Sequence, residues 1–220
     1  MVARFSQTNK PPLREKSDGY HHGDLRAALL KAAEEIIRES GVDGLTLRAC
    51  ARRAGVSHGA PAHHFGNIAG LLTEFAIEGF ERLTELMSGE KMNDADDELQ
   101  SAGLAYIHFA MRWPEHFRVM WRSELLNVKS LRLRQVRESA SKRLRDLLKC
   151  ANAHWNTPPS EDELSVRCQV AWSCVHGYAS LCVEGDRRTC SLNEAKRMLR
   201  VLRPSLVRGR DSASGIGVRS

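Results

Sequence analysis

Residues 44 to 65 read GLTLRACARRAGVSHGAPAHHF, and this stretch predicts two short helices joined by a turn. Thr46 can cap a helix over residues 47 to 54, because a threonine hydroxyl accepts a hydrogen bond from a backbone N–H of the first turn. Gly55 then ends that helix, and Ser57 is the expected cap of a second short helix that closes the stretch. The spacing is typical of a helix-turn-helix motif.

Arginines on the first short helix distinguish this stretch from an ordinary helical hairpin. Arg48 lies at the second helical position, where a cation opposes the helix dipole at a cost of a few tenths to about 1 kcal/mol. Such a placement indicates a bound anion or base edge. Arg48 and Arg52 are four residues apart and share a face, which could span a phosphate and a guanine edge. For Arg53, a solvated charge is an equally good interpretation.

The second short helix carries little side-chain bulk near its start. Residues 57 to 62 read SHGAPA, so the backbone there could approach base edges closely. Pro61 is tolerated in a first turn, where its missing N–H breaks no helical hydrogen bond. In a helix-turn-helix it is this second short helix that enters the major groove of DNA.

The rest of the chain also reads as helix. Apolar residues recur at steps of three and four, and strand signals are nearly absent, so we expect an all-α protein of about nine helices. Asn67, Ser130 and Ser160 are suitable N-caps, and Pro114 suits a first helical position. The seven further helices are expected over residues 24–40, 67–87, 95–112, 114–126, 130–154, 160–183 and 192–203.

The positive charge of the chain belongs to its two ends. The formal net charge is +6, yet residues 67 to 202 contain 19 basic and 19 acidic residues, whereas residues 1 to 66 contain 10 basic and 7 acidic residues. A basic N-terminal third suggests an anionic partner such as nucleic acid or a membrane surface. No apolar run approaches the roughly 20 residues that cross a bilayer, so we expect a cytoplasmic protein with no membrane partner.

Three segments together resemble the DNA-binding domain of TetR-type transcriptional repressors. They are Tyr20-His21-His22-Gly23-Asp24-Leu25-Arg26, Gly44-Leu45-Thr46-Leu47-Arg48 and Gly55-Val56-Ser57-His58-Gly59-Ala60-Pro61-Ala62-His63-His64-Phe65. This resemblance covers roughly residues 20 to 87. A shorter segment, Ala171-Trp172-Ser173-Cys174-Val175-His176-Gly177, resembles the Trp-His-Gly signature of one regulatory domain in that family and extends the match to about residue 203.

The resemblance implies a homodimer that holds a palindromic operator on double-stranded DNA and releases it when a small molecule binds. No catalytic residue, cofactor or metal is expected. By position, the residues that would face base edges are Arg48, His58, Gly59, Ala60 and His63. Those that would hold phosphates are Thr46, Arg52, Ser57 and His64, with help from the basic arm. His64 could instead pack locally beside Phe65.

Two positions depart from the family pattern. Ala62 stands where the family usually has a phosphate-contacting tyrosine, and Ile68 stands where the next helix usually begins with a lysine. Each lost contact should weaken DNA binding. An alternative is therefore a helical sensor of the same fold, for a small molecule or for thiol oxidation, that has weakened or lost DNA binding.

The resemblance also divides the chain into four parts. Residues 1–22 form an expected disordered basic arm, residues 23–66 the helix-turn-helix domain and residues 67–203 a domain for effector binding and dimerisation. Residues 204–220 have too little apolar content to fold and are expected to form a disordered tail.

Aromatic residues of the larger domain suggest a ligand pocket. Trp172 and His176 are four residues apart, so they share one helix face and could meet one cavity. An opposite wall is expected near Pro114, from Phe109, Trp113, Phe117 and Trp121. The competing interpretation is that these aromatic side chains simply form the core.

The last two predicted helices carry more apolar surface than one buried side needs. This surplus suits a four-helix bundle between two subunits. The residues expected at this dimer interface are Val175, Ala179, Leu192, Ala195, Met198, Leu199 and Leu202.

Enzymatic and metal-dependent functions find little support in the sequence. Cys168 and His176 share a helix face but lie about 12 Å apart along the axis, which one zinc ion cannot bridge. The six cysteines are expected to be reduced thiols. The basic run from Lys129 to Lys149 also has an apolar stripe, so we interpret its charges as a solvated helix face.

Overall fold

The computed structural model describes residues 22–89, 95–153, 158–185 and 190–207, and within these ranges all regular structure is helical. The all-α prediction is confirmed. The expected arm up to residue 21 and the tail from residue 208 lie outside the described residues. The helices are α1 (His22–Ser40), α2 (Leu47–Ala54), α3 (Ala60–Phe65), α4 (Ile68–Met87), α5 (Ala95–Arg112), α6 (Pro114–Met120), α7 (Leu131–Ala151), α8 (Glu161–Glu184) and α9 (Leu192–Leu206), with 3-10 turns η1 (Val42–Gly44) and η2 (Ser123–Leu125).

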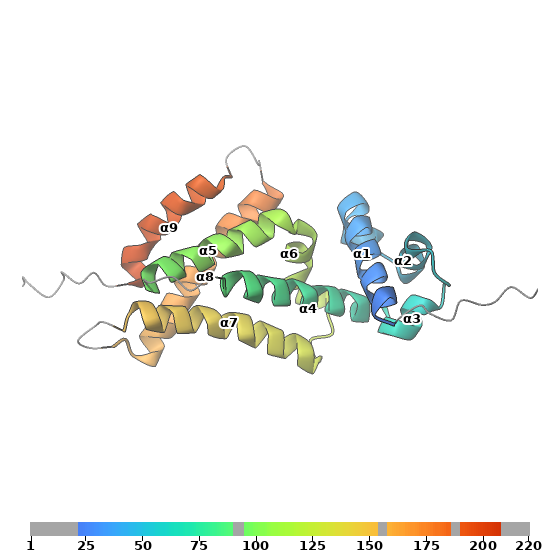
Figure 1. Cartoon of the computed structure of the whole chain (residues 1–220), viewed down its shortest axis with the longest axis horizontal. Coiled ribbons are helices and arrows are strands. Elements are labelled where there is room, and N and C mark those ends of the chain that lie inside the picture. Colours follow the sequence, from blue (N-terminus) through green and yellow to red (C-terminus); the bar gives the residue numbers. More distant parts are fainter. Residues whose placement is uncertain (1–21, 90–94, 154–157, 186–189, 208–220) are drawn as a thin grey trace, which may run out of the picture.

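The helices form two groups joined by α4. Figure 1 shows α1, α2 and α3 together at one end of the molecule, and α5 to α9 at the other, with α4 running from the first group into the second. Helix α4 packs against α5, α6 and α7, and also touches α1 and α3. Its apolar residues therefore belong to both groups, and α4 links them rigidly.

Side-chain caps fix where most helices begin. Thr46, Asn67, Ser130 and Ser160 each accept a hydrogen bond from the backbone N–H three residues ahead, which confirms these four predicted caps. Ser191 caps α9 in the same way. These bonds satisfy backbone donors that the first turn of a helix leaves without a partner.

The predicted cap at Ser57 is wrong. Helix α3 starts at Ala60 with Gly59 as its N-cap, and Ser57 instead accepts the Ala60 N–H through its backbone carbonyl at 3.0 Å. The later start places Pro61 in the first turn, where its ring meets no preceding turn of helix.

Two other helix ends differ from the prediction because tertiary contacts override the local pattern. Helix α6 ends at Met120, not near Leu126, and its last carbonyl accepts a hydrogen bond from Arg137 Nη2 at 3.1 Å. Helix α9 continues through Pro204 to Leu206, whose carbonyl accepts from Asn152 Nδ2 at 3.0 Å. Leu206 and Val207 are buried, so the start of the expected tail is part of the folded domain.

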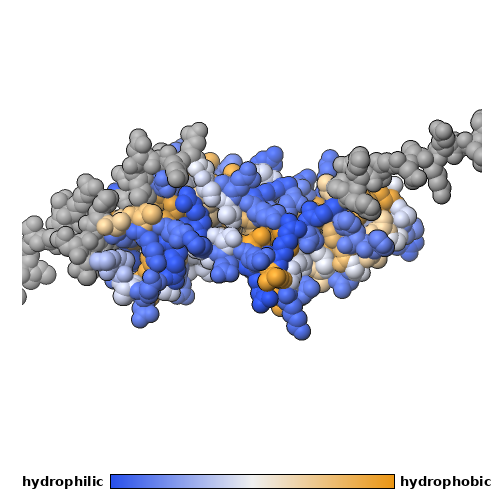
Figure 2. All heavy atoms as spheres, turned by 60° about the horizontal axis from the view of Figure 1, so that its bottom comes forward, coloured by the Kyte–Doolittle hydropathy of each residue, from blue (hydrophilic) through white to orange (hydrophobic). Residues whose placement is uncertain are grey.

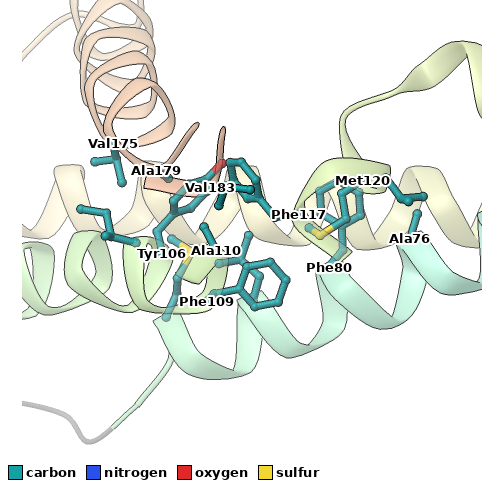
Figure 3. Packing of buried hydrophobic residues seen from close by; sticks show 14 of the residues in the cluster. Ala76, Phe80, Tyr106, Phe109, Ala110, Phe117, Met120, Val175, Ala179 and Val183 are labelled. Atoms are coloured by element: carbon teal, nitrogen blue, oxygen red, sulfur yellow. The ribbon is translucent and has the colours of Figure 1, made fainter. Parts of the chain in front are cut away.

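A glycine of α4 lies where α6 packs on it. A Cβ atom at Gly79 would lie 2.5 Å from Met120 Sδ and 3.3 Å from His116 Cβ, so a larger residue would require the Met120 side chain to move. Figure 3 shows Met120 beside Ala76 and Phe80 of α4, and the α5 residues Tyr106 and Ala110 near Ala179 and Val183 of α8. The core is therefore continuous from α4 through α5 and α6 to α8.

His116 is buried at this crossing without a hydrogen-bond partner. Its ring is 1% exposed and stacks on Phe75 at 3.8 Å, and neither ring nitrogen has an acceptor or donor. Burial lowers the pKa of His116 to about 3, and the nearby charges of Arg82 and Arg38 add to this effect. Glu78 Oε1 lies 3.9 Å from Nε2 but does not offset it. The imidazole is therefore neutral in the folded protein at ordinary pH.

We predict that the free energy of unfolding falls as the pH drops from about 6.5 towards 3. Below pH 6.5 the unfolded chain takes up a proton at His116 that the folded protein cannot accept until about pH 3. The loss should approach about 1.4 kcal/mol per pH unit, or about 2 kcal/mol between pH 6.5 and 5. Urea unfolding at these two pH values measures it. His116→Leu should remove most of this loss, and His108→Leu, at an exposed position of α5, should keep it. An unchanged pH dependence in His116→Leu would contradict the assignment.

Candidate DNA-binding surface and ligand cavity

The first turn of α2 carries an exposed cation without a partner. Arg48 is the second residue of α2, no acidic residue lies in that turn, and Thr46 Oγ1 accepts only the Ala49 N–H, at 3.1 Å. Within the described ranges, neither Arg48 nor Arg52 forms an ion pair or side-chain hydrogen bond, and both are exposed. The positive charge of this turn therefore faces solvent.

Arg53 is fixed against α1. Its Nη1 donates to Glu39 Oε1 at 2.7 Å, and Glu35 Oε2 lies 3.5 Å from the same nitrogen. Both carboxylates belong to α1. Arg53 thus ties α2 to α1, and is neither a free solvated charge nor available to a partner.

The turn and α3 present small and imidazole side chains on the same end of the molecule. Ser57, His58, Gly59 and His63 are exposed, whereas Ala60 is half-buried. The backbone at position 55 favours glycine, because Gly55 adopts a left-handed φ of 69° as the C-cap of α2. The backbone at position 59 does not require glycine, because its φ is −80° and a Cβ atom there would meet nothing within 4 Å.

His64 and the two departures from the family pattern also lie on α3 and at the start of α4. The half-buried ring of His64 packs edge-on against Phe65, with centroids 4.8 Å apart, as the local alternative predicts. Ala62 is exposed, and Ile68 is 37% exposed. Both departures therefore alter the exposed surface and leave the core intact.

Ion pairs join the small helical group to the larger one. Arg38 of α1 donates from Nε to Glu115 Oε1 of α6 at 3.0 Å, and Glu115 is 3% exposed. Arg26 of α1 pairs with Glu74 of α4 at 2.5 Å. The hydrogen bond to Glu115 raises the pKa of Arg38. A buried carboxylate of α6 is thus held by a cation that comes from the helix-turn-helix group.

The larger group encloses a cavity of about 470 Å³. Its walls come from α4, α5, α7, α8 and α9, together with Trp121 and Ser123 after α6. Most of the lining is apolar, with Phe80, Leu83, Leu144, Leu199 and Leu206 among its larger residues. This volume and this lining are in the range of small-molecule binding sites.

Two of the six predicted pocket residues, Trp121 and Trp172, line this cavity. His176 does not: it stacks on Trp172 at 4.9 Å, and its Nδ1 lies 2.8 Å from the Tyr106 hydroxyl oxygen. Phe109 and Phe117 are buried in the core, as the competing interpretation holds. Trp113 lies against the guanidinium groups of Arg82 and Arg112.

Sequence reasoning missed Arg137, which lines the cavity. A signal for it exists in the sequence. Arg137 stands four residues after Leu133 and three before Ala140, so a charged residue interrupts the apolar stripe of α7. The other charges of α7 are solvated or paired, for example Lys142 with Asp146 and Arg145 with Glu161. Figure 2 shows the face on which α7 lies, and it is mostly hydrophilic.

Most of the residues predicted for a dimer interface are buried or half-buried within the single subunit. Val175, Ala179, Ala195 and Leu199 are buried, Met198 and Leu202 are half-buried, and only Leu192 is exposed. The residues predicted on α8 face its own core. The large apolar residues that α8 and α9 leave exposed are Val166, Val170, Trp172, Leu181, Leu192 and Val201.

Thiols and possible metal ligands form no obvious reactive site where the structure describes them. No group of three or more His, Cys, Asp or Glu residues is arranged to hold a metal ion there. Burial raises the pKa of Cys50 to about 11, and burial together with Cys190 raises that of Cys182 to about 12, which lowers their thiolate populations. Among the described helices, none is long and apolar enough to span a bilayer.

The arrangement of a helix-turn-helix group, a linking helix and a larger helical group with its own cavity defines a class of helix-turn-helix regulators. Two family models match the chain: "Bacterial regulatory proteins, tetR family" over residues 29–75, and "Tetracyclin repressor-like, C-terminal domain" over residues 99–203. Together they cover more than half of it. The protein belongs to the TetR family of DNA-binding regulators. The Trp-His-Gly subtype of the C-terminal domain stays a prediction.

Solved structures share this fold. A protein of unknown function from Rhodococcus sp. RHA1 is 29% identical, with a TM-score of 0.73 over 86% of this chain and 99% of that one. The TetR family regulator PfmR from Thermus thermophilus is 17% identical, with a TM-score of 0.61 over 83% and 98%. The fatty acid degradation regulator FadR from Bacillus halodurans is 16% identical, with a TM-score of 0.67 over 89% and 99%. A search of curated protein sequences found no match.

We predict a measurable coupling between Arg38 and Glu115 across the junction of α1 and α6. A double-mutant cycle of Arg38→Gln and Glu115→Gln, measured by urea unfolding, should give a coupling of about 1 kcal/mol, since the carboxylate is buried but solvent screens the half-exposed arginine. The same cycle on the exposed pair of Arg145 and Glu161 should give less than about 0.5 kcal/mol. Equal values for the two pairs would show that the junction gains nothing from the burial of Glu115.

Proposed function

We propose that the protein is a ligand-responsive transcriptional repressor, without catalytic activity, that holds a palindromic operator as a homodimer. The observation that carries the proposal is Arg48 in the first turn of α2, which is exposed and forms no ion pair or side-chain hydrogen bond with any described residue. A cation that opposes the helix dipole and has no internal partner is explained by an external anion or base edge.

We assign the contacts to DNA by position, from the resemblance of residues 44–65 to the TetR family. Arg48, His58, Gly59, Ala60 and His63 would meet base edges in the major groove. Residues that would position the domain on phosphates are Thr46, Arg52, Ser57 and His64.

Ala62 and Ile68 each remove one phosphate contact of the family pattern. The affinity should therefore be modest, with a salt slope lowered by about one unit for the missing lysine.

A second copy of the chain would cover the apolar residues that α8 and α9 leave exposed. Val166, Val170 and Leu181 lie on one face of α8, opposite the residues that pack into its own core, and Leu181 is 66% exposed. Gly177 lies on the same face, and a Cβ atom there would meet nothing within the subunit. Val201 of α9 is 81% exposed. An interface of two helices from each subunit would bury these residues in a four-helix bundle.

The cavity would bind the effector, and α6 would carry its effect to the helix-turn-helix group. One end of α6 holds Arg137 of the cavity wall through the Met120 carbonyl, and the other end holds Arg38 of α1 through Glu115. A ligand that binds better to a form with a shifted α6 would shift the population towards it. The two α3 helices of a dimer would then no longer match half-sites about 34 to 36 Å apart.

The second candidate function is a small-molecule sensor of this fold that no longer binds DNA. The exposed Ala62 and Ile68 favour it, since both lie on the surface that would meet phosphates. The two candidates differ in one measurable property, because only the repressor selects a DNA sequence.

We predict that selection from a random DNA pool at low salt enriches a palindrome with half-sites about one helical turn apart. Arg48→Ala should weaken the selected operator by about 1–3 kcal/mol and relax the base choice, because a base contact is lost. Arg52→Ala, the matched control on the same face, should weaken all sequences alike. Quantitative binding to selected and scrambled duplexes measures both effects. Recovery of no palindrome would favour the sensor without DNA binding.

We also predict that Gly59→Ala separates DNA binding from stability. Its backbone suits any residue and the added methyl group meets nothing in the protein, so the free energy of unfolding should change by less than about 1 kcal/mol. The same methyl group would push the start of α3 away from base edges, so we expect operator affinity to fall at least about tenfold, or about 1.4 kcal/mol. Thermal unfolding and duplex titration measure the two quantities. Unchanged operator affinity would remove Gly59 from the contact surface.

A further inference from the structure

The cavity of the larger helical group carries positive charge without a compensating acid. Among the described residues that line it there are two arginines, Arg137 and Arg203, and no aspartate or glutamate. Arg203 is exposed and engages in another interaction, so the argument rests on Arg137. A ligand that enters this space meets apolar side chains and one half-buried cation.

The surroundings of Arg137 leave most of its hydrogen-bonding capacity unused. Its Nη2 donates to the Met120 carbonyl at 3.1 Å, and its guanidinium carbon lies 5.5 Å from the centre of the Phe80 ring. Its Nε is buried and has no acceptor. No carboxylate pairs with Arg137 anywhere in the described ranges, and burial lowers its pKa with no acidic neighbour to offset the effect. Because Arg137 is half-buried and no described acid neutralises it, an anion that met its guanidinium group would form a charge-assisted hydrogen bond.

Trp121 lies at the same end of the cavity as Arg137. Its ring lies 5.2 Å from the Phe80 ring and lines the cavity wall. Its Nε1 has no acceptor among the described residues, but protein atoms cover this nitrogen. Trp121 therefore supplies an aromatic surface beside Arg137.

The opposite end of the cavity is apolar. From Arg137 the lining of α7 continues through Ala140 to Leu144, a rise of about 10 Å along the helix. The walls around that end include Met87, Leu99 and Leu206. The cavity is therefore positive near Phe80 and mostly apolar along the rest of its length, where Gln100, Gln169 and Arg203 are the larger polar residues of the lining.

We propose that the cavity binds a small amphiphilic monoanion, with its carboxylate on the guanidinium group of Arg137 and its apolar body between α7, α5 and α9. This inference rests on the proposed function of the cavity as the effector site, and it names the chemical class of that effector. A guanidinium group suits a carboxylate because it can offer two parallel N–H donors. The contact with the Met120 carbonyl also brings the ligand to the end of α6.

Arg137 also has a structural role, since it fastens α7 to the end of α6. That role uses one of its five N–H donors and does not account for the absence of an acidic residue from the described cavity lining. A test must therefore separate the loss of an anion site from a loosened domain. Comparing ligands that differ only in head group does so.

The test compares decanoate, decanol and decylammonium, each below the concentration at which it forms micelles. Binding to the purified full-length protein is followed by calorimetry and by the fluorescence of its tryptophans, two of which line the cavity. We expect decanoate to bind at least tenfold more tightly than decanol, and decylammonium to bind most weakly. Arg137→Gln should reduce the preference for decanoate to less than about threefold while decanol binding stays within about twofold. Arg137→Lys should keep an intermediate preference.

Two further variants sharpen the comparison. Trp121→Phe keeps an aromatic ring in the cavity wall and leaves Arg137 in place, so the preference for decanoate should stay within about twofold. Arg134→Gln, at an exposed position on the preceding turn of α7, should leave that preference unchanged. Thermal unfolding of every variant reports any loosening of the domain.

The outcomes distinguish this inference from the proposed function. Equal binding of decanoate and decanol, no binding of decanoate, or an equal loss of both ligands in Arg137→Gln would overturn the monoanion site. Release of a selected operator by decanol as readily as by decanoate would overturn it too, and leave ligand-controlled repression standing. Arginine-dependent binding of decanoate with no effect on operator binding would support the site and contradict control of DNA through it.

Discussion

The packing of α6 against α4 around Gly79 is the constraint on which the rest of the structure depends. The missing Cβ of Gly79 leaves room for the Met120 side chain, and the His116 ring stacks on Phe75 of α4, so these contacts fix the position of a helix of only seven residues. Three contacts follow from that position. Glu115 meets Arg38 of α1, the Met120 carbonyl meets Arg137 of α7, and Trp121 reaches Phe80 and Trp172. Helix α6 thus contacts both α1 of the helix-turn-helix group and Arg137 of the cavity wall, so a shift of α6 would act on both.

Local signals in the sequence were enough to predict most of the fold. Thr46, Asn67, Ser130 and Ser160 cap the helices that they were expected to cap, because a cap depends only on a side chain and the turn that follows it. The failures occur where distant contacts decide. Nothing near residue 120 shows that Arg137 will bind the end of α6, and nothing near Pro204 shows that Leu206 will be buried beside Asn152. The predicted side-chain cap at Ser57 is wrong because the backbone carbonyl of Ser57, and not its hydroxyl group, accepts the hydrogen bond from the Ala60 N–H.

Candidate sites were predictable to the extent that exposure follows from helical spacing. Arg48 and Arg52 were expected to face outwards and do, but only the tertiary structure shows that Arg53 is held by Glu35 and Glu39 of α1. Helix α8 is apolar on two faces, and periodicity cannot tell which face meets the subunit's own core. For that reason Val175 and Ala179 were expected at an interface between subunits, whereas Val166, Val170 and Leu181 are the residues left exposed. The aromatic residues near Pro114 divide in the same way between the core, the cavity wall and the surface.

The end of α9 gives the chain terminus a role in the cavity. Leu206 lines the cavity, its carbonyl is held by Asn152, and Val207 is buried beside it. The last described turn of helix is therefore part of the cavity wall. A chain cut at Arg203 would lose this part of the wall as well as the end of the helix. Sequence changes between Pro204 and Val207 can alter the shape of the cavity without changing α1, α2 or α3.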